Sequence, residues 1–419
     1  MVKPSLSLAT DTRSKSIPRI SRRQSKLDAI LDGAATLFNE DGIGAVSLAD
    51  VAKRVGIGRA TLYHYVVDRE DLVFQCFQRS CALDTERLAI AADEPSAVDG
   101  LLNYFRESVS DSVPKAVVTD LGYMSADGRS IIGKSIRRNH QAMIELVSKG
   151  INLREIRPCD ERAVAHALAS MISHVQMAHR WVDLSTSKLD IEALIESLRI
   201  GSIADKKRNF QCSIDVERFN RLKAASFAPG SISEMRIEQI LMMASRMFNA
   251  RGVEAVSLDE IAVELGATRG AVYHYFSDKE ELVRRCADRA HDLYESFINE
   301  AEQTGRDSFE RLSIVGHLNS QAQAGTLQPL ALWIGLDAFS PGQLQRHRQR
   351  LRSLLHRTVS FAEEGIAAGD RLPLDPRTLA VARAGAFSWI PRWEPPIDDL
   401  TPFKIADELT ELFNHGLSA

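Results

Sequence analysis

Apolar residues recur along the chain at intervals of three and four, which is the spacing of one face of an α-helix. Residues 28–38, DAILDGAATLF, and residues 237–248, IEQILMMASRMF, both show this pattern. No sustained run alternates apolar and polar residues between hairpin turns, as half-buried strands would. The pattern therefore predicts an all-α fold, and by itself it is equally compatible with a helical scaffold protein.

A long segment of the sequence occurs twice. Residues 37–73 align with residues 247–283 at a constant offset of 210 without a gap, and about seventeen of these thirty-seven positions are identical. A weaker likeness joins residues 157–181 to residues 372–393. Since each unit of about 190 residues is far longer than a solenoid repeat, the sequence indicates a tandem duplication of a whole unit rather than an array.

The duplication predicts a division of the chain into two helical units, each of which begins with the repeated segment; the helix-turn-helix in that segment follows from its residues, and the regulatory role of the remainder is implied by a family resemblance. The predicted parts are a basic flexible arm (1–24), a first helix-turn-helix domain (25–80, with the motif at about 47–66), a first regulatory domain (81–205), a linker (206–232), a second helix-turn-helix domain (233–290, with the motif at about 257–276) and a second regulatory domain (291–419). The basic N-terminal tail is interpreted either as a solvated leader or as an arm that enters the minor groove.

Each copy of the repeat contains the start and stop residues of two short helices. Ser47 and Ser257 stand at N-cap positions, and a carboxylate follows three residues later. Gly56 and Gly266 then interrupt the helix at the spacing of a tight turn. A second short helix of about eight residues is predicted from about residue 58 or 268. Two such helices around a glycine-containing turn constitute a helix-turn-helix.

The second short helix carries the candidate chemistry. In GRATLYHY, residues 58–65, Leu62 is expected to face inward while Arg59, Tyr63 and His64 can face outward. An arginine can read guanine or hold a phosphate, whereas tyrosine and histidine donors suit phosphate oxygens. The second copy reads TRGAVYHY, residues 268–275, and offers the same groups. Tyr65 and its counterpart at 275 are interpreted as core aromatics.

These residues resemble the DNA-binding domain of TetR-type transcriptional repressors, with its pattern S-x-x-x-x-A-x-x-x-G, then a helix ending in L-Y-x-Y-F, then D-K-E-x-L. The first copy departs from the pattern at Gly58 and Val66, which predicts a less tightly anchored first head. Ser47 and Ser257 are also possible phosphate donors through their hydroxyl and backbone N–H groups. Together with these caps, the resemblance implies DNA contacts from Ser47, Arg59, Thr61, Tyr63, His64 and Arg69 in the first copy and from Ser257, Thr268, Arg269, Gly270, Tyr273, His274 and Lys279 in the second.

The resemblance also implies a small-molecule pocket in the regulatory domains and dimerisation through the last two helices of each. Those helices are expected at about 160–182, 190–204, 376–393 and 399–416. Aromatic and other large side chains occur in both regulatory domains, and the sequence leaves open whether they form a core or a ligand pocket. The residues concerned are Tyr104, Phe105, Tyr123, Met124 and Trp181 in the first half and Trp333, Phe339, Phe387, Trp389 and Trp393 in the second.

Composition narrows the possible functions. With 44% hydrophobic and 26% charged residues, the chain can bury sizeable cores. No apolar run has the length of a membrane span and no signal-peptide core is present, so no membrane partner and a cytoplasmic location are expected. The five cysteines form no CxxC pair. The absence of GxSxG, HExxH and phosphate-loop motifs argues against an enzyme, and no cofactor is expected.

No metal site is expected either. His166, His174 and His179 fall on one predicted helix, but their steps of eight and five residues do not place them as neighbours on one face. The net charge of −4 over the whole chain does not indicate a polyanion partner. In the second helix-turn-helix region, residues 233–284 have six basic against nine acidic side chains. Any attraction to DNA must therefore be local.

The sequence thus favours a transcriptional repressor that binds an imperfect palindrome in double-stranded DNA and is released by a small-molecule effector. Two heads in one chain predict an intrachain pseudo-dimer, with a homodimer of the chain as the other possibility. The alternative is a helical ligand-binding or scaffold protein with degenerate helix-turn-helix heads, for which the acidic second head is the best support.

Overall fold

The computed structural model describes residues 22–419, apart from 111–112, 179, 181–187, 225–230 and 395. These residues form helices joined by turns, and β-type pairing within the described part is limited to two isolated bridges, Ile156 with Ser418 and Ile203 with Arg371. The expected all-α fold is confirmed. No helix in the described ranges is long and apolar enough to cross a membrane.

Parts of the sequence on which expectations were placed lie outside the described residues. These are most of the N-terminal arm, residues 1–21, together with His179 and Trp181. The first helix, α1, begins at Arg22, so residues 22–24, the last of the expected flexible arm, are helical.

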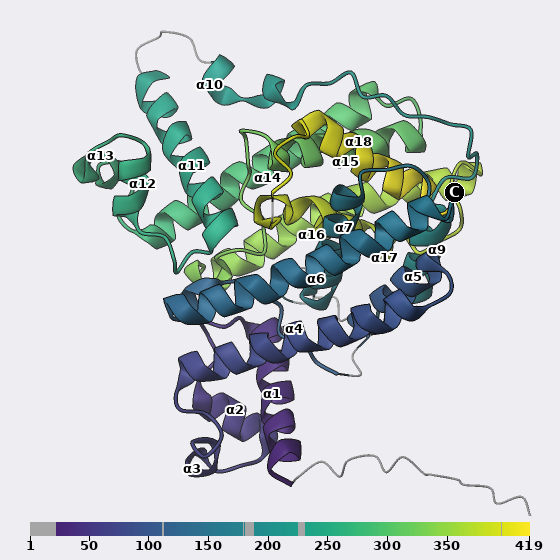
Figure 1. The fold of residues 1–419 in the computed structure, drawn as a ribbon. Coiled ribbons are helices and arrows are strands. Elements are labelled where there is room, and N and C mark those ends of the chain that lie inside the picture. The colour runs from purple at the N-terminus through teal and green to yellow at the C-terminus, as the bar shows by residue number, and fades with distance from the viewer. Residues whose placement is uncertain (1–21, 111–112, 179, 181–187, 225–230, 395) are drawn as a thin grey trace, which may run out of the picture.

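The first half has a head followed by a helical body (Figure 1). The head consists of α1 (Arg22–Asp41), α2 (Leu48–Val55) and α3 (Arg59–Leu62), and α4 (Arg69–Asp93) leads from it into the body. The body adds α5 (Ala97–Val109), the 3-10 turn η1 (Leu121–Tyr123), α6 (Ala126–Asn152), α7 (Glu161–Gln176) and α9 (Ile191–Ile200).

The second half repeats this order. Its head consists of α11 (Ser231–Arg251), α12 (Leu258–Glu264) and α13 (Arg269–Tyr273), followed by α14 (Lys279–Thr304). Its body adds α15 (Ser308–Ala324), the 3-10 turn η4 (Leu336–Ala338), α16 (Pro341–Ala368), α17 (Pro376–Ser388), the 3-10 turn η5 (Ile390–Arg392) and α18 (Pro402–His415).

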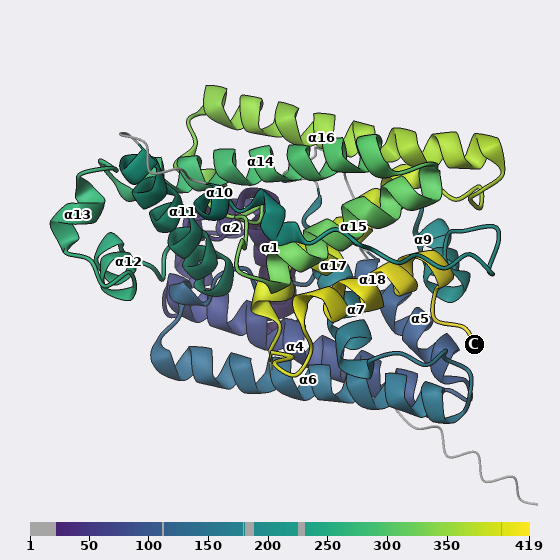
Figure 2. The same ribbon diagram turned by 90° about the horizontal axis from the view of Figure 1, so that it is seen from above.

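The two bodies form a layered structure. Seen from above, α14 and α16 lie along one side and α4 and α6 along the other, with α7, α17 and α18 between them (Figure 2). The two heads project from this body in different directions, α3 at the bottom and α13 at the left of Figure 1. The last residues of the described chain lie at the right, away from both heads.

The two halves meet mainly where α7 packs along α17, with α9 and α18 beside them. Close approach depends on Gly385, because a Cβ there would lie 2.5 Å from the Cβ of His174. At the edge, the guanidinium of Arg162 binds both carboxylate oxygens of Asp399, at 2.7 and 3.0 Å. The four helices at the positions predicted for dimerisation therefore pack against one another within one chain.

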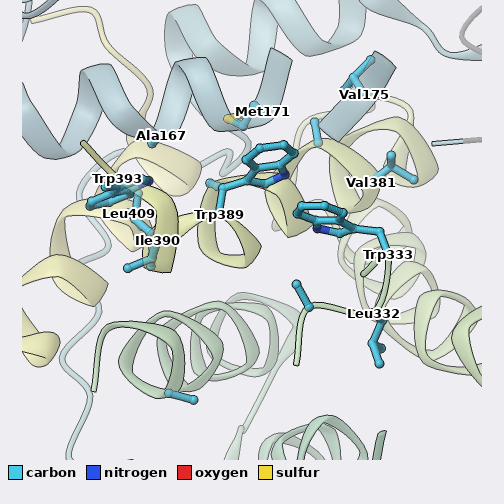
Figure 3. Packing of buried hydrophobic residues seen from close by; sticks show 14 of the residues in the cluster. Ala167, Met171, Val175, Leu332, Trp333, Val381, Trp389, Ile390, Trp393 and Leu409 are labelled. Atoms are coloured by element: carbon cyan, nitrogen blue, oxygen red, sulfur yellow. The ribbon is translucent and has the colours of Figure 1, made fainter. Parts of the chain in front are cut away.

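Tryptophans fill the space between the halves (Figure 3). Trp333 stacks on Trp389 with ring centroids 4.6 Å apart, beside Met171 and other apolar residues of α7. Trp393 stacks on His166 at 5.1 Å, and its indole N–H donates to Ser170 Oγ at 3.1 Å. These three tryptophans of the second half are thus part of the main hydrophobic core.

The described part of the expected linker is held against the second half. Arg208 pairs with Asp307 at 2.7 Å. Val216 is buried, and its backbone N–H donates to Gln321 Oε1 at 3.1 Å. Residues 206–222 of the predicted linker therefore pack against the second body, where apolar side chains such as Val216 and backbone groups find partners.

Candidate nucleic-acid interface

Both heads begin their first short helix with the same capping box. In the first, Asp50 N donates to Ser47 Oγ at 3.2 Å while Ser47 N donates to Asp50 Oδ2 at 2.9 Å. In the second, Ser257 and Glu260 make the same pair of bonds at 3.2 and 2.8 Å. Each box satisfies two N–H groups that the helix leaves unpaired, so α2 and α12 start at fixed places.

Glycine makes the turn between the two short helices. Gly56 has φ of 72° and Gly266 has φ of 62°, a left-handed conformation that other residues rarely adopt. In the first head, Ile57 N donates to Ala52 O at 3.0 Å and so closes the turn. The predicted helix-turn-helix is present in both heads at the predicted positions.

The second short helix is shorter than expected. In the first head, α3 ends at Leu62 and continues as tighter turns, in which His64 N donates to Thr61 O at 3.2 Å and Tyr65 N donates to Leu62 O at 2.9 Å. Neither Gly58 nor Thr268 makes a side-chain cap hydrogen bond. The length of about eight residues that the sequence predicts for these helices is therefore too great. They lack a side-chain cap and end in aromatic residues of modest helix propensity.

The buried face of the motif agrees with the apolar pattern. Leu62 and its counterpart Val272 are buried, and so are Val66 and its counterpart Phe276. Tyr65 is half-buried against the first head's core, as a core aromatic should be. Because Val66 is as buried as the phenylalanine that replaces it in the second head, the structure gives no sign of the looser packing predicted for the first head.

Most predicted contact residues lie on the exposed face of the heads. Tyr63 keeps 47% and Tyr273 keeps 40% of its surface exposed, which is unusual for large aromatic side chains. Thr61 is half-buried. The other exposed members of the predicted set are Ser47, Arg59, His64, Ser257, Thr268, Arg269, Gly270 and His274. Their contact with DNA stays a prediction.

Each head has an arginine over the tyrosine of its second short helix. The guanidinium of Arg59 lies 6.0 Å from the ring centre of Tyr63, and that of Arg269 lies 5.1 Å from the ring centre of Tyr273. Arg269 also pairs with Asp259 at 3.0 Å. Its hydrogen bond to Tyr273 raises the pKa of Arg269, followed by the attraction of Asp259. Both heads thus present a cation and an aromatic ring side by side.

Arg69 and Lys279, two of the predicted contacts, lie at the base of the heads instead. Arg69 donates to the backbone oxygens of Val46, at 3.1 Å, and of Ile43. Lys279 Nζ donates to Val253 O at 3.1 Å. Both side chains hold the loop that joins the first helix of their head to the helix-turn-helix. In this arrangement they position the head, and a direct DNA contact from either remains untested.

Sequence reasoning missed two cations on the first head, Lys53 and Arg54 of α2. Both are exposed, and Arg54 lies 4.0 Å from Glu40. They occupy the helix that precedes the recognition segment, where phosphate contacts would be close. The available signal was their exposed position in the helical pattern, because the apolar residues of α2 leave these two positions outward.

The loops of both heads meet at one junction. Asp337, in η4 of the second half, borders the first head's loop, and a Cβ on Gly44 would lie 3.0 Å from its Oδ2. Asp120, next to η1 of the first half, borders the second head's loop, and a Cβ on Gly252 would lie 2.3 Å from its Oδ2. Burial raises the pKa of both carboxyl groups. Each head therefore rests on a turn of the other half.

Two arginines line this junction. A Cβ on Gly42 would lie 2.5 Å from Arg180 Nη2, so this side chain covers the end of α1. Arg392 Nε donates to Asn249 O of α11 at 2.5 Å, and its Nη1 donates to Thr119 O of the first half. Burial lowers the pKa of both, that of Arg392 to about 10. Arg180 and Arg392 stand at matching places near the ends of the two copies of the weaker repeat, and this match is the signal that the sequence offers for them.

A cavity opens in each regulatory half. The one in the first half has a volume of about 760 Å³ and is lined by both halves, including Lys115, His140 and Arg392. The one in the second half has about 160 Å³ and is lined mainly by second-half residues, including Trp333 and Phe387, together with His174 and Ser202 of the first half. Several of the aromatic residues that the sequence left undecided thus belong to the core and to a cavity wall at once.

Comparison with known proteins agrees with this structure. The family described as "Bacterial regulatory proteins, tetR family" matches residues 30–76 and 240–286, and "Tetracyclin repressor-like, C-terminal domain" matches residues 305–417. Two regulators of Pseudomonas putida, the probable HTH-type transcriptional regulator ArpR and the HTH-type transcriptional regulator TtgR, are each 29% identical over 126 residues. These matches cover 30% of this chain and 51% of each relative, so the chain spans about half the length of the curated relatives it matches.

A solved structure is also similar, that of a transcriptional regulator of the TetR/AcrR family from Thermobifida fusca. It is 26% identical, with a TM-score of 0.31, over 42% of this chain and 96% of that one. The family matches fall on both heads and on the second body, at the positions where the structure repeats itself. The chain therefore belongs to the TetR family of bacterial regulatory proteins and consists of two tandem TetR-like units.

Proposed function

We propose that this protein is a DNA-binding transcriptional repressor whose two heads occupy the two half-sites of one operator. The observation that carries the proposal is the pair of helix-turn-helix heads, each with an exposed arginine, tyrosine and histidine on its second short helix. Arginine contacts to guanine would read sequence, and the tyrosine and histidine donors would fix the register on phosphates.

The pseudo-dimer arrangement is supported by the packing between the halves. A twofold dimer needs matching helices from both partners at its interface, and here α7 and α9 face α17 and α18 of the same chain. The junction supports it further, since the loop of each head rests on a turn of the other half. The relative placement of the heads would then be set within one chain.

Because the heads differ, the two half-sites should be related but not identical. Ala60 and Thr61 of the first head stand where the second has Gly270 and Ala271. The operator is expected to be an imperfect palindrome whose half-sites are separated by about one helical turn of DNA or a multiple of it.

Regulation by a small molecule is supported by the cavities in both halves. Arg392 lines the first-half cavity and also binds the backbone of α11, so a molecule bound there would act on a residue that holds the second head. A ligand weakens DNA binding only if it prefers the arrangement in which the heads are wrongly spaced. Ligand and DNA would then oppose each other reciprocally.

The test begins with selection of duplexes from a random-sequence library, followed by footprinting of the selected site. Two related half-sites protected by one protein chain per duplex, as counted by light scattering, are the expected result. Failure to enrich any sequence contradicts the proposal. An obligatory two-chain complex on a single pair of half-sites overturns the pseudo-dimer.

Base reading and phosphate contact are separable by single variants. Arg59→Ala and Arg269→Ala should each lose about 1–3 kcal/mol and relax base preference at one half-site. Tyr63→Ala should weaken binding to all sequences alike. Equal losses on operator and random DNA for both arginine variants would reject the base-reading role.

A second candidate, a ligand-binding protein whose heads have lost DNA binding, is favoured by the second head. There the recognition arginine Arg269 is paired with Asp259, and acidic side chains outnumber basic ones. The same library selection separates the two candidates, because a degenerate protein would enrich nothing while its cavities still bound small molecules.

A further inference from the structure

The charged groups of the second-half cavity are both cations. Arg371 and Arg383 line it, and none of the other described residues in its wall is an aspartate or glutamate. The remainder of the wall is largely apolar, with leucines from α15, α16 and α17 and with Phe387. An apolar cavity that holds two guanidinium groups has the chemistry of a site for an anion with an apolar body.

Arg383 is the more available of the two. Its Nη2 donates to Phe413 O at 2.9 Å and to Ser197 Oγ at 3.3 Å. Its guanidinium also lies 5.3 Å from the ring centre of Phe413. Within the described chain, no hydrogen bond of its Nε or Nη1 is present and no carboxylate pairs with it. The side chain lies deep in the protein and remains partly exposed, which is exposure to the cavity that it lines.

Arg371 completes the positive end of the cavity. It is buried, and it donates to Ser308 Oγ at 3.1 Å and to Ser202 Oγ at 2.9 Å. The nearby carboxylates Asp307 and Asp370 face Arg208 instead, at 2.7 and 3.9 Å, and do not line the cavity.

Burial depresses the pKa of both arginines, that of Arg371 to about 10 and that of Arg383 to about 9, and their mutual repulsion adds to the depression for Arg383. Both remain charged at neutral pH. Two buried cations with neutral partners are costly to keep, and an anion placed between them would relieve that cost.

The size of the cavity limits the ligand. Its volume of about 160 Å³ is close to the roughly 150 Å³ of an apolar cavity that accommodates benzene. We propose that this cavity binds a small monocarboxylate with an apolar body of about six to eight carbons, with the carboxylate on Arg383 and Arg371. The inference rests on the proposed regulation by a small molecule and names the chemical class of that molecule.

The site is connected to the rest of the molecule in two ways. Arg383 binds Ser197 on α9, which belongs to the first half, so a carboxylate competing for this guanidinium acts on the contact between the halves. Trp333 lines the cavity and also the junction below the heads. The wall of the cavity therefore includes one residue, Arg383, of the contact between the halves and one, Trp333, of the junction on which the heads rest.

The test is calorimetric titration of the full-length protein with benzoate and hexanoate, and with the neutral benzamide and hexanamide. Carboxylates should bind at least about tenfold more tightly than the matched amides, since a charge-assisted bond to a buried guanidinium is the stronger one. Arg383→Gln should remove at least about tenfold of the carboxylate affinity and little of the amide affinity. Arg377→Gln, an exposed change on the same helix, should alter neither.

Amides that bind as tightly as the carboxylates, or no binding by any of the four probes, would overturn the proposal. The preference of the unchanged protein for carboxylate over amide keeps the test valid if Arg383→Gln does not fold. DNA binding is measured separately on the selected operator. Carboxylate binding without any enrichment of DNA sequences would reject the proposed repressor and leave the anion site standing. DNA binding with no preference for carboxylates would reject the anion site and leave the proposed repressor standing.

Discussion

The two heads share one frame and differ on its surface. Both have the same capping box, the same left-handed glycine and the same buried positions behind the second short helix. Yet residues 47–69 of the first head have four basic against two acidic side chains, whereas residues 257–279 of the second have two basic against four acidic. The frame therefore tolerates a reversal of charge on the face that would approach DNA.

The arginines of the second head are also engaged by that head's own acids. Arg269 pairs with Asp259 at 3.0 Å and Arg251 with Glu260 at 2.7 Å. The position of Asp259 is occupied by Ala49 in the first head. Because DNA binding depends on local positive charge, we expect the first head to supply most of the electrostatic attraction to DNA.

The heads differ in their attachment as well. The buried residues of the first head form a hydrophobic cluster of their own with α4 and a few residues of the body, including Met124 and Ile132. Those of the second head, such as Phe248 and Phe276, belong to the main cluster that runs through both halves. The second head is therefore packed into the core that spans both halves, whereas the first head has a core shared only with α4 and a few residues of its own body.

The largest effect should come from removing the cation and tyrosine of one head at a time. Arg59→Ala with Tyr63→Ala should weaken operator binding by about 100-fold or more, because each such contact is worth about 1–3 kcal/mol and linked heads bind as a unit. Arg269→Ala with Tyr273→Ala should cost clearly less, because Arg269 is already paired with Asp259. Fluorescence anisotropy on the selected operator measures both.

All four side chains in these two variants are exposed, so unchanged thermal midpoints serve as the control for folding. Equal losses from both heads, or a greater loss from the second, would contradict the assignment of attraction to the first head.

A smaller effect is expected from giving the second head the basic pair of the first. Val263→Lys with Glu264→Arg places the Lys53-Arg54 pair at the corresponding positions of α12. Affinity for DNA should rise about tenfold at low salt, and the slope of log K against log salt should steepen by about 2 if both new cations reach phosphates. The reciprocal change, Lys53→Val with Arg54→Glu, should lower affinity and flatten that slope. An unchanged slope in both variants would show that this face does not approach the backbone.

The turn glycines test the shared frame rather than the differing surface. Gly56→Ala and Gly266→Ala should each destabilise their head by about 1–2 kcal/mol, because both positions have left-handed φ although nothing lies within 4 Å of the added Cβ. Hydrogen exchange of α2 and α12 amides measures the two losses separately. Gly270→Ala is the matched control, since it adds a methyl group in helical backbone and should stabilise slightly. Clearly unequal losses would mean that the frames are not equivalent.

The smallest effect is a dependence of the second head's stability on acid. The hydrogen bond from Arg251, then those from Ser257, lower the pKa of Glu260 to about 2. Because the pKa of this carboxyl is lower in the folded than in the unfolded protein, its ionised form stabilises the fold at pH values above the unfolded-state pKa. This contribution to stability is lost as the pH falls from about 5 towards 2. Since the group is on the surface, the loss should be below about 1 kcal/mol.

Thermal midpoints at pH 7 and pH 3.5 measure this loss. Glu260→Gln should reduce the difference between the two midpoints, whereas Glu264→Gln, an exposed change on the same helix, should leave it intact. A difference that Glu260→Gln does not alter would place the acid sensitivity elsewhere.

What the sequence predicted well is what depends on near neighbours. The capping boxes, the turn glycines and the buried Leu62 follow from spacings of a few residues, and all three could be located without a structure. The positions of Arg69 and Lys279 could not, because their partners are backbone oxygens of a loop more than twenty residues earlier. The junction could be predicted even less from the sequence, because Arg392 contacts Thr119 only after the two halves have docked.

The anion-selective character of the cavity was hidden for the same reason. Nothing near Arg383 in the sequence distinguishes it from the exposed Arg377 on the same helix. Their difference arises from the direction in which α17 faces, which is set by its packing against α7, α15 and α16. Short-range patterns identify elements, whereas the function of a single buried charge is set by tertiary contacts.

The joining of two unequal heads in one polypeptide also bears on how such a regulator changes over generations. In a dimer of identical chains, one codon change alters both recognition surfaces, so a new half-site preference must appear twice in the operator at the same moment. Here a change at Arg269 leaves Arg59 as it was. On the proposed operator with two half-sites, each surface could therefore change with its own half-site, and an asymmetric operator would give the bound protein a defined orientation along the chromosome.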